Sequence, residues 1–156
     1  MPEPGDATNH TLLAFDYGRQ RIGIAVGQTL TRTAQPLTTV YNHNGEPDWQ
    51  AIDKLQQQWQ AGTIIIGLPS NKDGTDNEVC RAVRNFAVAV EKRFHLPVHL
   101  VDERYSSASA TAFLKAQRHS GRRGRQVRKE DIDKIAAAVI LQSWLDDLST
   151  RTRNEE

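Results

Sequence analysis

Hydrophobic and polar positions in residues 11–41 follow patterns that are typical of β-strands. The apolar run at residues 11–15 ends at Asp16, and residues 21–28 alternate branched apolar side chains with glycine and alanine. These patterns predict a buried strand, a short turn and a second strand that pairs with the first as a hairpin. A third strand is predicted at residues 32–41, where Pro36 favours an edge position in the sheet.

Beyond residue 48 the apolar positions recur every three or four residues, which is helical periodicity. Helices are predicted at residues 48–59, 77–94 and 106–116, with a last helix capped by Asp131. The apolar runs at 63–66 and 97–101 predict two more strands. Strand–helix–strand connections are parallel and right-handed in nearly all cases. The chain is therefore expected to be an α/β domain with a mixed five-stranded sheet, its first three strands antiparallel, and helices on both faces.

Acidic residues follow the predicted parallel strands. Asp16 ends the first strand, and Asp102 and Glu103 end the last one. Such strand ends lie at one edge of the sheet, where α/β folds usually hold ligands. Asp133, in the first turn of the last helix, shares a face with apolar residues and is expected to point inward. Strand alternation lets only one of Asp102 and Glu103 face this site, and either choice stays open.

Carboxylates gathered in this way repel one another unless a cation lies between them. Oxygen ligands with no Cys or His companion suit Mg²⁺ or Mn²⁺, which can activate water for phosphodiester cleavage. Each acid alone also fits a structural role: a turn acid, a capping acid, or an ion-pair partner of Arg104. Their convergence favours a metal site of Asp16, Glu103 and Asp133, with Asp102 as a further candidate ligand.

A strongly basic segment leads into the last helix. Residues 117–129 carry no acid and six basic side chains: Arg118, Arg122, Arg123, Arg125, Arg128 and Lys129. Arginine binds phosphate oxygens in a bidentate manner, so the segment is suited to a nucleic-acid backbone. A solvated loop is the alternative. Arg19 and Arg104, which flank the acids, are predicted to contact phosphates as well.

Composition changes this picture little. The chain has 156 residues, 38% hydrophobic and 25% charged, which suits one domain over residues 1–150 with flexible tails at 1–10 and 149–156. Because the net charge is only +1, the charge of the whole chain does not indicate nucleic-acid binding, and the indication comes from the basic segment alone. A lone cysteine, Cys80, with no signal peptide or membrane span, leads us to expect a cytoplasmic protein with a buried thiol.

Four motifs together resemble one known family. The segments LLAFDYGRQRIGIAVG, IIIGLPSNKDGT, VDERYSSASA and DIDKIAAAVILQSWL are similar to those of the YqgF family, also called RuvX, over about residues 12–148. The resemblance implies an RNase H-like fold with Asp16, Glu103 and Asp133 as catalytic acids. It also implies a nuclease (a hydrolase) that trims precursor 16S ribosomal RNA during ribosome biogenesis, within a ribosomal particle or outside it. Lys134 and Ser70 depart from the family's usual residues.

Three other functions compete with this one. A Holliday junction resolvase would cut four-way DNA, and its two-fold substrate calls for a dimer. The sequence shows no dimer surface, so a monomer or weak homodimer is expected. An actin-like nucleotide-binding module also begins with an acid–glycine hairpin, but it needs a second domain for which 156 residues leave no room. A non-catalytic RNA-binding assembly factor would need the arginines and not the acids.

Overall fold

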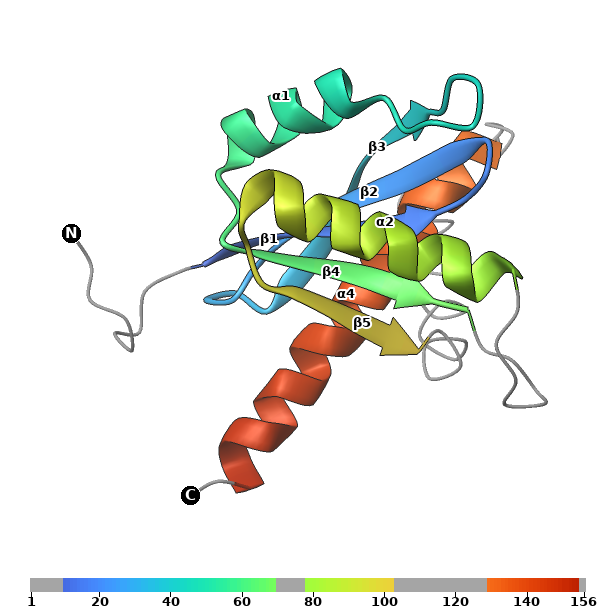
Figure 1. Ribbon diagram of the computed structural model, residues 1–156. Coiled ribbons are helices and arrows are strands. Elements are labelled where there is room, and N and C mark those ends of the chain that lie inside the picture. The colour runs from blue at the N-terminus through green and yellow to red at the C-terminus, as the bar shows by residue number, and fades with distance from the viewer. Residues whose placement is uncertain (1–9, 70–77, 103–128, 155–156) are drawn as a thin grey trace, which may run out of the picture.

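The computed structural model of the chain describes residues 10–69, 78–102 and 129–154 (Figure 1). The strands there are β1 (Thr11–Tyr17), β2 (Arg21–Gln28), β3 (Thr33–Tyr41), β4 (Thr63–Leu68) and β5 (Val98–Asp102). The helices are α1 (Trp49–Trp59), α2 (Glu78–Phe94) and α4 (Lys129–Asn154). The helix predicted at 106–116 lies outside the described residues.

The five strands form one mixed sheet in the order β3-β2-β1-β4-β5. β1 and β3 both pair with β2 in antiparallel fashion, while β1, β4 and β5 run parallel. The predicted sheet is therefore confirmed, and so is the edge position of the strand with Pro36. Ala25 pairs with Pro36 and Ile24 with Thr38, which leaves Leu37 as an extra residue in a β-bulge.

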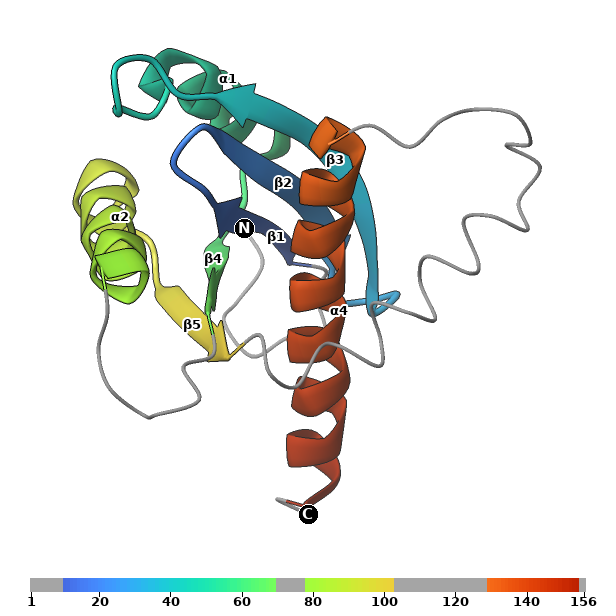
Figure 2. The same cartoon turned by 90° about the vertical axis from the view of Figure 1, so that its right-hand side faces the viewer.

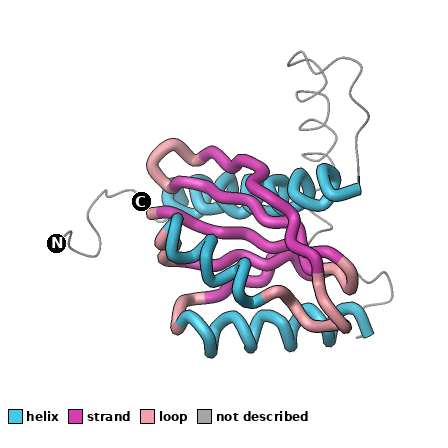
Figure 3. Tube along the Cα trace, turned by 90° about the horizontal axis from the view of Figure 1, so that it is seen from above, coloured by secondary structure: helices cyan, strands magenta, loops and turns pink. Residues whose placement is uncertain are grey.

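Helices cover both faces of this sheet, with α1 and α2 on one side and α4 on the other (Figure 2). Seen from above, the sheet is a middle layer between helical layers (Figure 3). Successive residues of β1 alternate between the two cores: Leu13 and Phe15 pack toward α1 and α2, Leu12 and Ala14 toward α4. Burying each large apolar side chain contributes roughly 1.5–3 kcal/mol.

Helix ends agree only partly with the prediction. Asp48 caps α1, its Oδ1 accepting a hydrogen bond from the amide of Ala51 at 3.2 Å. The prediction that Asp131 caps the last helix is wrong, because α4 begins at Lys129. α4 also continues to Asn154, into the segment expected to be a flexible tail, since that polar stretch contains no Gly or Pro to stop it.

The C-terminal part of α4 extends past the edge of the sheet (Figure 1). In the described part of the chain no helix is both long enough and apolar enough to cross a membrane.

Cys80 is buried in the first turn of α2. Its thiol donates to the carbonyl oxygen of Pro69 at 3.5 Å, just after β4. The predicted buried thiol is therefore confirmed, and Cys80 acts as a small apolar residue between these two elements.

Candidate metal and nucleic-acid site

Asp16 lies in β1 on the face that α4 covers. It has the same parity along the strand as Leu12 and Ala14, which belong to the core beneath α4. Its partner in the antiparallel pair with β2 is Gly23, so both residues lie on that face. Asp16 is half-buried, at the end of β1 that precedes the turn into β2.

Gly23 allows the start of α4 to approach the sheet. A Cβ at this position would overlap the carbonyl oxygen of Asp133 and lie 2.8 Å from the amide nitrogen of Lys134. The backbone of Asp133 therefore lies on β2, directly beside the pairing position of Asp16. Two acids more than a hundred residues apart in the sequence are brought together on one face of the sheet.

The side chain of Asp133 lies against the sheet, with 23% of its surface exposed. Its neighbour Ile132 points away from the sheet and is 50% exposed. Lys134, the departure from the family pattern, pairs with Asp131 at 3.4 Å along the same helix. The side chain of Asp133 therefore points from α4 toward the sheet, at the position where β2 has Gly23.

Arg21 also belongs to this site, although it was not among the predicted site residues. Its Nε donates to Oδ2 of Asp133 at 2.6 Å, and 26% of its side chain is exposed. Hydrogen bonds between charged groups are shorter and stronger than neutral ones. The signal in the sequence was alternation, since Arg21 shares its face with Gly23 and Ala25, the small-residue face of β2.

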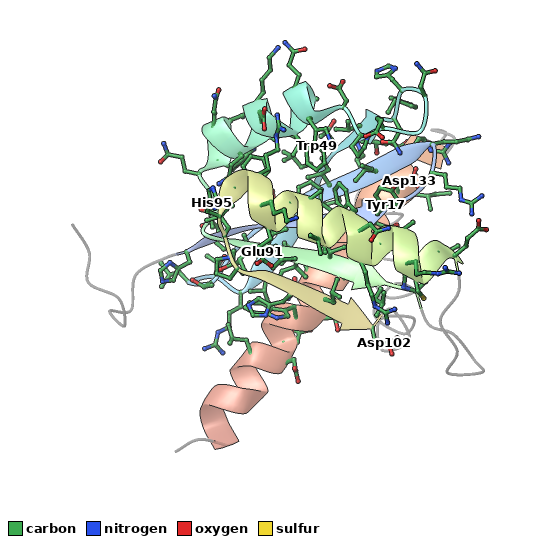
Figure 4. All side chains as sticks on the ribbon, viewed as in Figure 1. Tyr17, Trp49, Glu91, His95, Asp102 and Asp133 are labelled. Atoms are coloured by element: carbon green, nitrogen blue, oxygen red, sulfur yellow. The ribbon has the colours of Figure 1, made fainter. Side chains whose placement is uncertain are left out.

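Asp102 lies on the other face of the sheet. It ends β5 with the parity of Val98, which packs against the core beneath α1 and α2. His99, of opposite parity, instead meets Trp144 of α4, with ring centroids 5.6 Å apart. Asp102 and Asp133 lie toward the same end of the sheet (Figure 4), but Asp102 does not share the face of Asp16. Glu103 lies outside the described residues.

The donor set of the described residues fits a hard cation. Asp16 and Asp133 offer carboxylate oxygens only, the ligands that Mg²⁺ and Mn²⁺ prefer. Within residues 10–69, 78–102 and 129–154, no cluster of three or more His, Cys, Asp or Glu side chains surrounds a metal position. A complete shell therefore requires a ligand from elsewhere in the chain or oxygens of water and substrate.

Of the predicted phosphate ligands, Arg19 and Lys129 fall within the described residues. Arg19, in the β1–β2 turn, pairs with Glu78 at 3.1 Å, and both side chains are mostly exposed. Exposed pairs of this kind contribute little to stability, so a phosphate can compete for the guanidinium. Lys129 begins α4, one helical turn before Asp133. The other predicted contacts lie outside the described residues: Arg104, Arg118, Arg122, Arg123, Arg125 and Arg128.

Asn42 fixes the turn that follows Asp16. Its Nδ2 donates to the carbonyl oxygens of Gly18 and Arg19 at 2.9 and 2.8 Å, and its backbone amide donates to Gln20 at 2.9 Å. Asn42 was not among the predicted site residues. Three hydrogen bonds from one residue now tie the end of β3 to the turn that carries Arg19.

Solved structures of junction resolvases have a similar fold. RuvC of T. thermophilus in complex with a Holliday junction substrate superposes with a TM-score of 0.58 at 12% identity, covering 90% of this chain and 96% of that one. The Fowlpox virus resolvase in complex with Holliday junction DNA gives 0.54 at 10% identity, covering 88% and 98%. At such low identity the likeness concerns the fold alone, and it confirms the predicted RNase H-like architecture.

Sequence relatives are much more similar. A protein of Saccharophagus degradans named "Putative pre-16S rRNA nuclease" is 43% identical over 88% of this chain and 94% of its own length. A relative of the same name from Marinobacter nauticus is 41% identical over 92% and 96%. The profile of the RuvX family, described as Holliday junction resolvase, matches residues 10–147. This chain therefore belongs to the RuvX family.

Proposed function

We propose that this protein is a nuclease that uses Mg²⁺ or Mn²⁺ to hydrolyse phosphodiester bonds in precursor 16S ribosomal RNA. The relatives named as pre-16S rRNA nucleases support the reaction and the substrate. The structural observation that carries the proposal is the contact of Asp133 with Gly23, the strand partner of Asp16. This contact supports a site formed by the carboxylates of Asp16 in β1 and Asp133 in α4.

Asp16 and Asp133 would hold the cation, with Glu103 as the third ligand. Glu103 is preferred to Asp102 because Asp102, the last residue of β5, has the parity of the face opposite to that of Asp16. When bound, the cation would polarise the phosphate and lower the pKa of a bound water. The protein's own contribution is to hold these acids in place and to exclude bulk water from the α4 side of β1 and β2.

Phosphate groups of the substrate would be held by arginines around the acids. Arg19 lies in the turn directly after β1, and its exposed pair with Glu78 can yield to a phosphate. The basic segment at residues 117–129 would extend this contact along the nucleic acid. Its arginines can form bidentate hydrogen bonds with backbone phosphates. Binding is therefore expected to weaken steeply as the salt concentration rises.

The test is cleavage of a labelled precursor 16S rRNA fragment by the wild type and by Asp16→Asn, with Mn²⁺ and with chelator. Asp147→Asn is the matched control, because it makes the same substitution at an exposed acid of α4. We expect cleavage by the wild type and by the control, only with metal, and none by Asp16→Asn. Full activity of Asp16→Asn would contradict the proposal.

A four-way DNA junction in the same assay tests the second candidate, a resolvase, which the description of the family profile favours. Cleavage of the junction in preference to RNA, by a dimeric protein, would replace the RNA substrate with DNA. Tight binding of the RNA without cleavage of either substrate would instead indicate an assembly factor that has no nuclease activity.

A further inference from the structure

The contact between Arg21 and Asp133 links β2 to α4 across the face of the candidate metal site. Its 2.6 Å length, with about a quarter of each side chain exposed, distinguishes it from the exposed pair of Arg19 and Glu78. Removing either partner would leave a partly buried charge without its main counter-charge. The contact therefore restrains where the carboxylate of Asp133 points.

We propose that Arg21 is a positioning residue that fixes the carboxylate of Asp133 beside Asp16, so that Asp133 presents its other oxygen to the divalent cation. This inference rests on the proposed function. Arg21 Nε engages Oδ2 of Asp133. Within the described part of the chain, Oδ1 has no hydrogen-bond or ion-pair partner, and it is the atom that we assign to the cation.

The position of Arg21 on β2 makes this role geometrically consistent. Arg21 and Gly23 are two residues apart on one strand and so project to the same face. Gly23 receives the backbone of Asp133, and Arg21 reaches its carboxylate from the adjacent site on that face. Gly23 determines how closely α4 approaches the sheet, and Arg21 determines the direction of the Asp133 side chain.

The positive charge of Arg21 also supports its role in positioning Asp133. Clustered carboxylates repel one another when no cation is bound, and a fixed guanidinium offsets part of that repulsion. Because the guanidinium occupies one oxygen only, it orients the carboxylate without blocking the second one. Residues that orient metal ligands typically change metal affinity by about 10- to 100-fold when they are replaced.

The experiment measures the Kd of Mn²⁺ alone by titration calorimetry for the wild type, Arg21→Met and Arg21→Lys. Methionine keeps an unbranched stem of similar reach and removes the guanidinium. Lys134→Met is the matched control, since it also removes a cation from this region, but one paired with Asp131 and not with Asp133. Circular dichroism at the titration temperature verifies that each variant is folded.

We expect Arg21→Met to bind Mn²⁺ about 10-fold or more weakly, Arg21→Lys to recover part of the loss, and Lys134→Met to match the wild type. In the cleavage assay, Arg21→Met should need more Mn²⁺ for half-maximal rate, while kcat at saturating metal falls less. A purely structural role would lower the unfolding temperature and leave the Kd of the folded protein unchanged.

The two hypotheses fail in different ways. Equal Mn²⁺ affinity of the wild type and a folded Arg21→Met would overturn the positioning role and leave the nuclease proposal intact. If the wild type itself binds no Mn²⁺, both the metal-dependent mechanism and the role of Arg21 are wrong. An affinity lost equally in Lys134→Met would show that general charge, and not the contact with Asp133, is responsible.

Discussion

The α-carbon of Gly23 lies against the backbone of Asp133, close enough that a methyl group there would overlap the Asp133 carbonyl oxygen. The atoms in the way are backbone atoms of α4, which cannot move aside as a flexible side chain can. The contact holds the N-terminal part of α4 on β2, beside the strand position of Asp16. Gly23 therefore controls how closely the two candidate metal ligands approach.

Gly23→Ala should destabilise the protein and disturb the candidate site together. Overpacking a tight contact costs typically ~1–3 kcal/mol, because the helix must shift away from the strand. We expect a lower free energy of unfolding in urea and reduced cleavage at temperatures where the variant is still folded. Gly62→Ala is the control, since a Cβ there meets nothing within 4 Å. Equal stability of the two variants would show that α4 is not held by this contact.

Asn42→Asp should loosen the turn after Asp16. The substitution replaces an amide donor, which bonds the carbonyl oxygens of Gly18 and Arg19, with a carboxylate that repels them. Loss of such bonds costs roughly 1–3 kcal/mol, measurable as a lower urea midpoint, and cleavage should fall as the turn moves. Asn44→Asp, at an exposed position with φ of 54°, should be close to neutral because Asp tolerates that conformation. A neutral Asn42→Asp would refute this account.

Gln142→Ala should release the first residues of the edge strand β3. The Gln142 side chain accepts from the buried amide of Ala34 at 3.0 Å and donates to the carbonyl oxygen of Arg32 at 2.8 Å. An unsatisfied amide costs roughly 1–3 kcal/mol, so hydrogen exchange at Ala34 should accelerate. In Gln142→Glu the acceptor for Ala34 remains, and exchange there should stay slower than in the alanine variant. Identical exchange in all three proteins would show that α4 does not hold this edge.

Arg93→Met should weaken the protein at neutral pH and much less in acid. Nε and Nη2 of Arg93 bond both oxygens of Asp53, at 2.7 and 2.6 Å, joining α2 to α1. This hydrogen bonding lowers the pKa of Asp53 below its ordinary value of 3.8. A lowered pKa means that the carboxylate stabilises the fold fully above the unfolded value, and that this stabilisation disappears as pH falls through the folded value.

The measurement is the urea midpoint of the wild type and Arg93→Met between pH 2 and pH 7. The difference between the two urea midpoints should be constant near neutral pH and should largely disappear below pH 3.8. The contact of Arg93 with the Trp49 ring, 5.1 Å from its centroid, does not titrate and leaves a small difference in acid. Lys92→Met, which removes a neighbouring charge of α2, is the control and should show no such pH dependence. A gap that persists unchanged in acid would exclude Asp53 as its cause.

Periodicity in the sequence was enough to predict the sheet. Alternation in residues 21–28 and the break at Pro36 predicted a hairpin with an edge strand, because side-chain direction follows from the two-residue period of a strand alone. The ends of helices were less predictable. Asp131 has a residue type that often caps helices, but α4 begins at Lys129, and a capping residue type in the sequence does not by itself fix where a helix starts.

Local patterns were sufficient to identify which acids follow strands, which helix face is apolar and to which family the motifs are similar. They left open whether Asp102 shares the face of Asp16, and they did not select Arg21 or Asn42. Those relations depend on strand register and on the depth at which α4 packs over Gly23. They join residues far apart in the chain and became visible in the folded protein alone, because local patterns fix the direction of a side chain and not its distant partner.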